Sequence, residues 1–467
     1  MESKNIFILK DLDELNKLSY HSYDPEILFL INSIKNKAKG VMLDKLSEDI
    51  TYGSGKWELR TTDYVPESFP KRIKLLQISN ISENGEIIET ERDKYIPLEL
   101  HEKWKTSKVR KGDLIVAITG TLGRIALFNQ DYEANLNQAL GIIRLKKEYE
   151  GIKIIPEYIH LYLNSYYAIE QFMRFGGFRA GQSGLSLDEI GSVYVILPKE
   201  DEQKKIIEEI NKIRKEAISH FDKFIEYSNK SKNIAQEILN IPIPNEDERI
   251  FIYSEKFKKR IDVPYNSPFL KKLLNNIKKN KYDELNKLLK EAENKLIFSD
   301  FYNVIDLDNI DENLSEIKSW KEVKVLNSTK TVFKKNNLLM SKMGGEKGNI
   351  ILIDEKYDGF LGSGELVPFE LREESPVSLE YLFYVLRSPY ISKQIEYSLS
   401  GCSRMRISNE EMKILLIPLP KDEKQEKQVI NSVRELRKNA IFEKEQYLLK
   451  KQGVYDKFKD LLKKYLY

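Results

Sequence analysis

The chain has 467 residues, of which 41% are hydrophobic and 32% charged, and its formal net charge at pH 7 is +3. This length accommodates two to four domains with cores of their own, and no apolar run approaches the roughly 18 residues of a membrane span. The N-terminal sequence has no signal-peptide architecture, and the single cysteine, Cys402, excludes an intrachain disulfide, so we expect a cytoplasmic protein. The four histidines are scattered without zinc spacing, and we expect no metal site.

The distribution of charge bears on nucleic-acid binding. A domain that binds nucleic acid usually has a basic excess. Here the excess lies in residues 421–467, which contain 13 basic and 8 acidic side chains, while the preceding residues are close to neutral. This argues modestly against DNA binding unless basic residues cluster on one face or a partner supplies phosphate contacts.

Residues 20–200 combine helical and strand patterns, which predicts a mixed α/β domain. A helix is expected from Tyr20 to about Asn36, because Asp24-Pro25 is a helix-start signal. Two short apolar runs, 113–118 and 124–128, flank Thr119-Gly-Thr-Leu-Gly123 and predict a strand–turn–strand unit. A further helix and a closing strand are expected at Pro156–Phe175 and Gly191–Pro198.

The segment 201–242 predicts one long helix that takes part in a coiled coil. Apolar residues recur at alternating spacings of three and four, which is the pattern of an a/d seam. The helix would extend roughly 55–65 Å at 1.5 Å per residue, and Ile241-Pro-Ile-Pro244 ends it. The predicted seam residues are Ile206, Ile210, Ile213, Ala217, Phe224, Ile234 and Ile238.

The rest of the chain repeats this order of elements. A helix is expected from Pro268, strands around 338–353, a helix from Ser378 and a strand at Ile414–Pro418. The segment 421–467 then predicts a second long helix, whose apolar seam is interrupted by polar residues. Its predicted seam residues are Val433, Leu436, Ala440, Tyr447, Val454 and Phe458.

The two halves are also similar residue by residue. Pro198-Lys-Glu-Asp-Glu-Gln-Lys-Lys-Ile-Ile matches Pro420-Lys-Asp-Glu-Lys-Gln-Glu-Lys-Gln-Val-Ile, and Ile213-Arg-Lys-Glu-Ala-Ile matches Leu436-Arg-Lys-Asn-Ala-Ile. Further anchors fall in the same order: 78–84 with 307–313, 111–115 with 335–339, and 157–161 with 380–384. Because chance similarity would not keep this order, the repeated unit is a domain plus a helix.

The repeat predicts an α+β fold of two similar mixed α/β domains joined by two long antiparallel coiled-coil helices, with pseudo-two-fold symmetry. The predicted boundaries are 1–200 and 243–420 for the domains, and 201–242 and 421–467 for the helices. We expect the two helices to pair, because each has an apolar seam and neither has an obvious third partner. The alternative is that each helix packs on its own domain.

These features resemble the specificity subunits of type I restriction–modification systems. The family alternates target-recognition domains with conserved helices, twice in each chain. Lys111-Gly-Asp-Leu-Ile-Val-Ala-Ile-Thr-Gly-Thr-Leu-Gly-Arg124 resembles the Gly-Asp-Ile-Leu and Gly-Thr-x-Gly-Arg hairpin of such domains, and Gly181-Gln-Ser-Gly-Leu-Ser186 resembles the loop before their closing strand. The second half departs from this pattern at Asn336-Asn337, at Met343–Gly348 and at Gly401–Arg406, as two different recognition sequences would require.

The resemblance implies a DNA-recognition subunit that reads a bipartite target in double-stranded DNA, with the helices acting as a ruler between two half-sites. It also implies two methyltransferase subunits and a motor-nuclease subunit as partners, and no membrane. The chain itself would not be an enzyme. It would hold no cofactor, since S-adenosylmethionine, ATP and Mg would belong to the partner subunits.

Base reading needs donor-rich side chains on loops that enter a groove. The candidates in the first half are Thr119, Thr121, Arg124, Arg179, Gln182 and Ser183. The candidates in the second half are Lys342, Lys347, Ser403, Arg404 and Arg406. For any one residue, a solvated or turn-forming role is the alternative. A group of aromatics is instead expected in the core, because most of them have helical spacing: Tyr162, Tyr166, Tyr167, Phe172, Phe175 and Phe178.

Three catalytic motifs fail on inspection. Phe360-Leu-Gly-Ser-Gly364 and Asp262-Val-Pro-Tyr265 approach motifs of amino-methyltransferases, but a predicted strand follows the first and the second is a domain start in the repeat. Glu322-Val-Lys324 with Asp306 or Asp308 approaches a nuclease metal site but has no counterpart in the first half. No Gly-x-x-x-x-Gly-Lys phosphate loop is present. The non-enzymatic alternative is a coiled-coil scaffold that binds only protein.

Overall fold

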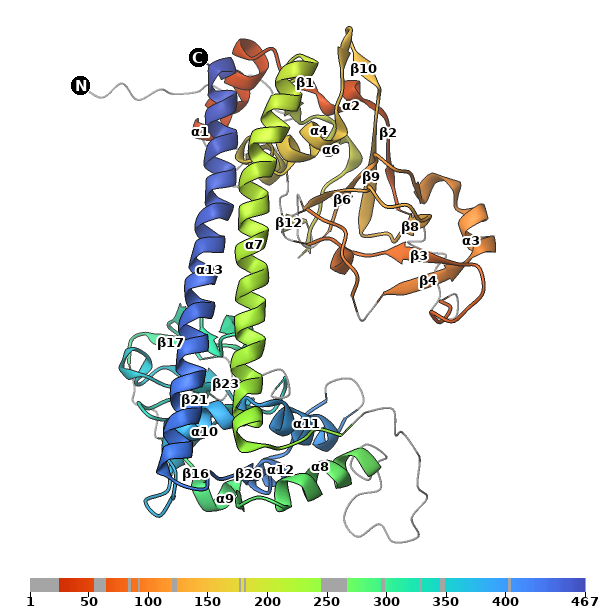
Figure 1. The fold of residues 1–467 in the computed structure, drawn as a ribbon. Helices are drawn as coiled ribbons and strands as arrows, with labels where there is room; N and C mark the ends of the chain where they lie inside the picture. The colour runs from red at the N-terminus through yellow and green to blue at the C-terminus, as the bar shows by residue number, and fades with distance from the viewer. Residues whose placement is uncertain are drawn as a thin grey trace, which may run out of the picture. The chain divides into compact units, whose positions relative to one another are not determined.

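The structure is a computed structural model of the chain (Figure 1). It describes residues 25–53, 64–82, 85–90, 93–119, 124–175, 178–179, 182–244, 267–294, 299–326, 330–344, 349–401 and 405–466. The chain divides into two compact units: unit 1 comprises the residues up to Glu216 and those from Leu449 onward, and unit 2 runs from Ala217 to Leu448. Each unit therefore contains one sheet domain and a part of each long helix.

Unit 1 contains two four-stranded sheets, with strand orders β2-β9-β6-β7 and β4-β3-β8-β5. Only β3 and β8 pair in parallel among the described strands of these sheets. The bounds are β2 Ser47–Tyr52, β3 Arg72–Leu76, β4 Lys94–Pro97, β5 Lys108–Val109, β6 Leu114–Ala117, β7 Ile125–Leu127, β8 Ala134–Leu136 and β9 Leu140–Leu145. Short two-stranded pairs are formed by β1 Val41–Met42 with β14 Tyr194–Val195, β10 Glu148–Tyr149 with β11 Ile152–Lys153, and β12 Phe178–Arg179 with β13 Gln182–Ser183.

The central strand β6 separates two cores. Successive side chains of a strand point to opposite faces. Leu114 and Val116 accordingly lie in the cluster formed with the helices, whereas Ile115 and Ala117 lie in a second cluster with β7, β8 and β9. This double burial explains why the sequence at β6 is a continuous apolar run without alternation.

The prediction of a single helix at Pro156–Phe175 is wrong. Pro156–Phe175 forms two helices, α4 Pro156–Leu163 and α5 Tyr166–Phe175, and not one. The break follows from polar side chains that bond the last carbonyls of α4: Asn164 Nδ2 donates to His160 O and Ser165 Oγ to Tyr162 O. The other helices are α1 Pro25–Asn32, the π-helical turn Ser33–Lys37, α2 Leu43–Leu46, α3 Leu98–Lys103 and α6 Leu187–Gly191.

Two further boundaries differ from the predictions. The first helix is regular only over Pro25–Asn32, and the predicted residues 20–24 lie outside the described ranges. The predicted strand Gly191–Pro198 is reduced to Tyr194–Val195, because α6 extends to Gly191 and the backbone N–H of Ser192 is bonded to Asp188 O of this helix. The strands predicted on either side of the turn at 119–123 are confirmed as β6 and β7.

Unit 2 repeats the sheet topology of unit 1. Its four-stranded sheets have the orders β16-β25-β22-β23 and β20-β17-β24-β21, and β17 pairs with β24 in parallel, as β3 does with β8. The strands of these sheets are β16 Leu289–Glu291, β17 Tyr302–Ile305, β20 Lys321–Val323, β21 Lys330–Val332, β22 Leu338–Ser341, β23 Ile350–Leu352, β24 Leu361–Ser363 and β25 Leu366–Leu371. The remaining pairs are β15 Tyr282–Glu284 with β26 Leu416–Pro418 and β18 Ile310–Asp311 with β19 Glu316–Ile317.

The helices predicted to begin at Pro268 and Ser378 are confirmed as α8 Pro268–Lys278 and α10 Leu379–Leu386, the latter with Ser378 as its N-cap. The other helices of this domain are α9 Leu285–Leu288, α11 Pro389–Ser398 and α12 Asn409–Lys413. The repeated topology confirms the prediction of an α+β fold with two similar mixed domains.

The two long helices are α7 Glu200–Leu239 and α13 Glu423–Leu466. Each begins a few residues after the proline of its repeat, Pro198 or Pro420. α7 ends where Asn240 adopts a left-handed φ of 54°, just before Ile241-Pro-Ile-Pro244. Acidic side chains lie in the first turn of each helix, among them Glu202 and Glu423. Their negative charge stabilises the helix start, because the helix dipole is positive at that end.

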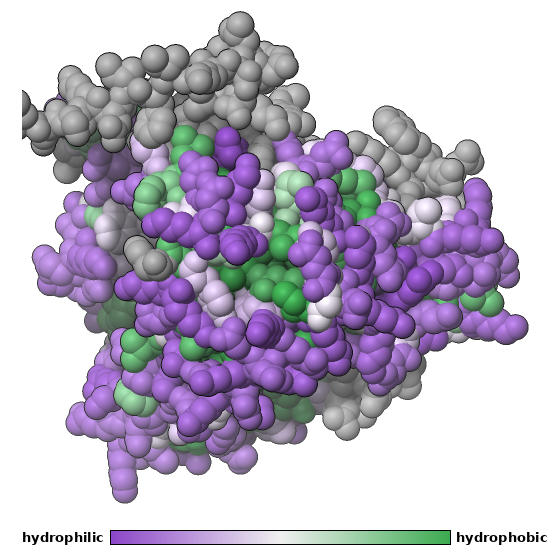
Figure 2. All heavy atoms as spheres, turned by 90° about the horizontal axis from the view of Figure 1, so that it is seen from above, coloured by the Kyte–Doolittle hydropathy of each residue, from purple (hydrophilic) through white to green (hydrophobic). Residues whose placement is uncertain are grey.

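One face of the structure is mainly polar. Figure 2 shows a face covered largely by hydrophilic residues, with hydrophobic residues gathered in a small group near the centre of the view. None of the helices in the described ranges is both long and apolar enough to cross a membrane.

Candidate nucleic-acid interface

In unit 1, three segments meet at the end of β6 where the first candidate loop begins. The backbone N–H of Ile118 donates to Ala139 O at 3.0 Å, and Leu185 N–H donates to Ile118 O at 2.9 Å. Thr119 and Gly184 form a β-bridge. The start of the 119–124 loop therefore lies beside the loop that precedes α6, although more than sixty residues separate them in the sequence.

In unit 2, the equivalent segments meet through equivalent bonds. Lys342 N–H donates to Glu365 O at 2.8 Å, and Ile407 N–H donates to Lys342 O at 3.0 Å. The backbones of Ser400 and Arg406 form a β-bridge that closes the loop before α12. We call these two regions the recognition edges: 118–124 with 178–185 in unit 1, and 341–344 with 363–366 and 400–407 in unit 2.

Local sequence signals shape both edges. Ser186 and Ser408 each form a capping box with the glutamate three residues later, so the loop ends at a fixed point where α6 or α12 begins. In unit 2 the turn after β22 also requires glycine. Gly344 has a φ of 70°, and an added Cβ would lie 2.7 Å from Asn349 Nδ2.

The candidate side chains of unit 1 are only partly described. Thr119 is exposed at the edge, whereas the half-buried Arg124 donates from Nη1 to the carbonyl of Ile81 at 3.2 Å. Arg124 is thus tied to its own domain by at least one bond. The backbones of Arg179, Gln182 and Ser183 lie in the β12–β13 hairpin, and Thr121 lies outside the described residues.

In unit 2, Arg406 and Glu365 form an ion pair that the sequence did not predict. Arg406 Nε lies 3.0 Å from both carboxylate oxygens of Glu365, and Nη2 lies 2.8 Å from Oε1. The carboxylate raises the pKa of Arg406 above its ordinary value. Lys342 is half-buried beside this pair, and Lys347, Ser403 and Arg404 lie outside the described residues.

No sequence motif marks Glu365, so the sequence did not predict it. The carbonyl of Glu365 accepts the bond that the carbonyl of Ala139 accepts in unit 1. An acidic residue of the second half therefore stands where the first half has a small apolar one. The two edges therefore share a backbone framework and differ in the side chains it presents.

The long helices pair within unit 1 through three regularly spaced ion pairs, which we call the ion ladder. Lys464, Lys457 and Lys450 of α13 pair with Glu202, Glu209 and Glu216 of α7 at 2.6, 2.8 and 2.6 Å. Residue numbers fall by seven on one helix as they rise by seven on the other. The two segments are therefore antiparallel and in heptad register.

The helices also pair within unit 2, in the same antiparallel sense. His220 Nδ1 of α7 lies 2.6 Å from Glu443 Oε2 of α13, and Gln425 Nε2 donates to Ile238 O at 3.1 Å. The rings of Phe221 and Tyr447 pack with centroids 5.1 Å apart.

The predicted seam residues are all buried or half-buried. Several also contact the sheet domains, so pairing with the other helix and packing on a domain occur together. Ile206 and Ile210 share a hydrophobic cluster with Phe458, Tyr158 and Tyr162 in unit 1. The buried members of the seam are Ile206, Ile210, Ala217, Phe224, Val433, Ala440 and Phe458, and the half-buried members are Ile213, Ile234, Ile238, Leu436, Tyr447 and Val454.

The aromatic residues predicted to lie in the core are placed as follows. Tyr162, Tyr167 and Phe172 are buried, which confirms the prediction for them, but Tyr166 is 42% exposed, so the prediction is wrong there. Tyr166 follows the break between α4 and α5, which turns it away from the buried face. The side chains of Phe175 and Phe178 lie outside those described.

The apparent catalytic motifs take structural positions. Leu361–Ser363 is β24, and the strand predicted to follow it is confirmed as β25. Asp306 pairs with Lys330 at 3.4 Å, and Lys324 lies over the ring of Phe301. Within the described ranges no group of three or more His, Cys, Asp or Glu residues is arranged to hold a metal ion, and residues 262–265 lie outside those ranges.

The family model described as "Type I restriction modification DNA specificity domain" matches the chain twice, over residues 56–223 and 269–431. Each match contains most of one sheet domain with its recognition edge and the first part of the following long helix; the first match begins after β2. The two matches together cover more than half of the sequence, and the chain belongs to this family of DNA specificity domains.

Individual proteins that resemble this chain have low sequence identity to it. The specificity subunit of the type I restriction enzyme EcoBI from Escherichia coli is 28% identical over 141 residues, which is 30% of this chain and 28% of the length of that relative. Among solved structures, the type I S subunit from M. genitalium is 13% identical, with 90% of this chain and 95% of that chain covered and a TM-score of 0.41. The HsdS subunit from Thermoanaerobacter tengcongensis is also 13% identical, with the same coverage and a TM-score of 0.33.

Proposed function

We propose that this chain is the sequence-specific DNA-recognition subunit of a type I restriction–modification complex and that it reads a bipartite target in double-stranded DNA. The observation that carries the proposal is the pair of recognition edges in a chain of the DNA-specificity-domain family. Their backbone bonds are equivalent, but Ala139 and Glu365 stand at equivalent positions, as do Gly184 and Arg406. Equivalent frames with unlike side chains suit two unlike half-sites.

The chain acts without chemistry of its own in this proposal. Two methyltransferase subunits supply base methylation with S-adenosylmethionine, and a motor-nuclease subunit supplies ATP-driven translocation and cleavage with Mg. Apolar residues exposed on the long helices support a helix-binding partner: Ile218 and Phe442 in unit 2 are 43% and 54% exposed, and Leu449 in unit 1 is 63% exposed. A methyltransferase subunit is the proposed occupant of these positions.

The direct test is DNA binding by the full chain, with and without the methyltransferase subunit. The target would come from methylation-sensitive sequencing of the source genome, where we expect a split motif modified on both strands. A gel shift with a duplex carrying that motif should show a specific complex at least when the methyltransferase is present. Absence of binding under both conditions would instead favour the coiled-coil scaffold and would overturn the proposal.

The ion ladder allows the ruler hypothesis to be tested separately. One heptad would be inserted in α7 between Glu209 and Glu216, and one in α13 between Lys450 and Lys457, so that the antiparallel register is preserved. Seven residues add about 10 Å of helix, or roughly three base pairs. The preferred spacer should lengthen while both half-sites stay the same. An insertion in only one helix, which breaks the register, is the matched control, and an unchanged spacer in the double insertion would contradict the ruler.

A further inference from the structure

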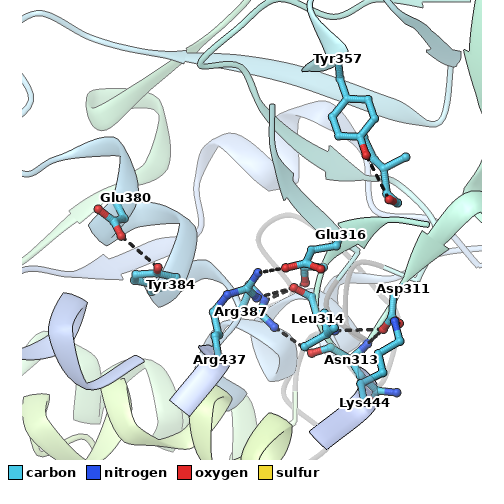
Figure 3. A network of polar contacts seen from close by, with 12 residues as sticks. Asp311, Asn313, Leu314, Glu316, Tyr357, Glu380, Tyr384, Arg387, Arg437 and Lys444 are labelled. Atoms are coloured by element: carbon cyan, nitrogen blue, oxygen red, sulfur yellow. Dashed lines mark hydrogen bonds and ion pairs between the residues drawn. The ribbon is translucent and has the colours of Figure 1, made fainter. Parts of the chain in front are cut away.

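In unit 2 the β18–β19 hairpin is enclosed by basic side chains (Figure 3). Leu314 near its tip is buried and packs against Phe224 of α7 and Ala440 of α13. The hairpin is therefore a place where the second sheet domain contacts both long helices at once, in addition to its main core.

Helix α13 contributes two of the basic side chains. Arg437 donates from Nη1 to Leu314 O and from Nη2 to Glu316 Oε1, the latter at 2.9 Å. About two turns further along α13, Lys444 Nζ lies 2.5 Å from Asp311 Oδ2. Burial lowers the pKa of Arg437, because the charged guanidinium has lost most of its water.

The domain contributes a third basic side chain from the junction of α10 and α11. Arg387 is 2% exposed and donates from Nε to Ser315 Oγ at 2.7 Å and from Nη2 to Asn313 O at 3.0 Å. Burial, followed by the charge of Arg437, lowers the pKa of Arg387 to about 9. Both guanidinium groups lie within 5.4 Å of the centre of the Phe383 ring.

This arrangement tolerates little movement of the hairpin. The two arginines repel each other, and their charges are compensated by the carbonyls and carboxylates of one short segment. A shift of that segment would leave desolvated charges without partners, which costs far more than a shift between apolar surfaces. We call Arg387, Arg437 and Lys444 the hairpin clamp.

The first repeat has no equivalent clamp among its described residues. Arg214 of α7 occupies the position of Arg437, but it lines a cavity of about 380 Å³ together with Gly85, Glu86 and His160. No hydrogen bond joins its guanidinium to the described part of the 81–87 segment, and Glu86 acts on it only as a nearby charge. His160 Nε2, which is 2.9 Å from Gly85 O, holds this segment to α4 of its own domain.

We propose that the clamp orients the second recognition domain on its helices and thereby fixes the spacer that the protein accepts between the two half-sites. This inference rests on the proposed bipartite reading of DNA. Arg437 is its central positioning residue, since it alone of the three joins α13 to both a carbonyl and a carboxylate of the hairpin. Arg437 touches no base and acts by placing the recognition edge that contains Lys342 and Arg406.

The test uses the full chain assembled with its methyltransferase subunits and a set of duplexes whose spacer differs from the native one by one or two base pairs. In Arg437→Gln, the preference for the native spacer over its neighbours should fall at least fivefold, while the preferred bases of both half-sites stay the same. Arg437→Lys should recover part of the preference, because it restores the charge without the fork of donors.

Two other arginines provide matched controls for Arg437→Gln. Arg434→Gln removes an arginine one turn away, whose guanidinium is bonded to Glu380 at 2.8 Å and not to the hairpin. Arg214→Gln removes the equivalent arginine of the first repeat. Both should leave the spacer preference unchanged.

A second variant covers the case in which Arg437→Gln does not fold. Glu316→Gln keeps an acceptor for Arg437 and removes the charge, and it should shift the spacer preference in the same direction by a smaller factor. An unchanged preference in the folded variants, or an equal loss of methylation at every spacer, would overturn the inference. If the wild-type protein shows no split target at all, the proposed function fails first and this inference fails with it.

Discussion

Arg406 and Glu365 hold each other at the recognition edge of unit 2, with 3.0 Å between Arg406 Nε and each carboxylate oxygen. Glu365 lies in the turn between β24 and β25, and Arg406 lies in the loop before α12. The ion pair thus fixes the guanidinium where three separate segments converge. A planar group with spare donors in a fixed orientation suits the O6 and N7 acceptors of guanine.

Replacing Arg406 by alanine should relax reading at one half-site only. A bidentate contact to a base discriminates by about 1–3 kcal/mol, so the preference at one base pair should largely disappear. Methylation of targets with single substitutions in each half-site would measure this. Arg372→Ala is the matched control, because Arg372 lies beyond the other end of β25 and is bonded to Asn286 O. A uniform loss at all sequences would mean a phosphate contact instead.

Replacing Glu365 by glutamine should strengthen the dependence of DNA affinity on salt. The variant keeps an acceptor but removes the carboxylate charge, so Arg406 becomes available to a phosphate. One additional phosphate contact steepens the slope of log affinity against log salt by about 0.9. Glu370→Gln is the control, since Glu370 pairs with Lys290 elsewhere on β25 at 2.9 Å. An unaltered slope in Glu365→Gln would show that the released Arg406 does not contact a phosphate.

The duplicated fold could be predicted because its signals are local and occur twice. The apolar runs around 113–118 and 338–341 predict strands, and both become central strands of their sheets. Proline marks the approach to each long helix at Pro198 and Pro420, and heptad spacing continues from there. Each of these features depends on residues within one or two turns of each other, which a sequence pattern can detect.

Features that depend on distant residues could not be predicted. The break at Asn164 and Ser165 divides a pattern that is otherwise continuously helical, and Asn164 Nδ2 there also donates to Ile125 O, 39 positions earlier, at 3.0 Å. The pairing of Arg406 with Glu365 joins residues 41 positions apart, and that of Arg437 with Glu316 joins residues 121 apart. Nothing in the local sequence of a glutamate marks which arginine it will meet.

Stability of unit 1 should fall in acid because of His160. Burial, followed by the charge of Arg214, lowers the pKa of His160 from 6.5 to about 4. Between these values the unfolded chain binds a proton that the native protein does not, so the contribution is complete above pH 6.5 and is lost as the pH falls toward 4. The difference corresponds to at most about 3 kcal/mol.

The pH effect can be measured by hydrogen exchange of the α4 amides at pH 7 and at pH 5. The opening free energy of the wild-type protein should decrease between these conditions. In His160→Gln, which cannot titrate, the decrease should be clearly smaller. Amides of α10 in unit 2, where Phe383 stands at the position of His160, provide an internal control. Equal decreases in both proteins would contradict the assignment.

The C-terminal part of α13 should be essential to unit 1, because Phe458 fills its core. Phe458 is 3% exposed, and its ring lies 6.4 Å from those of Tyr158 and of Tyr162 in α4. Phe458→Ala should lower the local stability of unit 1 by about 3–5 kcal/mol, as expected for a buried aromatic side chain. Hydrogen exchange should accelerate in α4 and in the part of α13 that follows Leu448.

Tyr455→Ala is the matched control for this prediction. Tyr455 lies one turn earlier on α13 and is 36% exposed, so its truncation should change local stability by no more than about 0.5 kcal/mol. The amides of α10 and α11 in unit 2 should be unaffected by either variant, because the described contacts of Phe458 all lie in unit 1. Acceleration confined to α13, without α4, would mean that Phe458 stabilises only its own helix and that the first domain does not depend on the end of the second repeat.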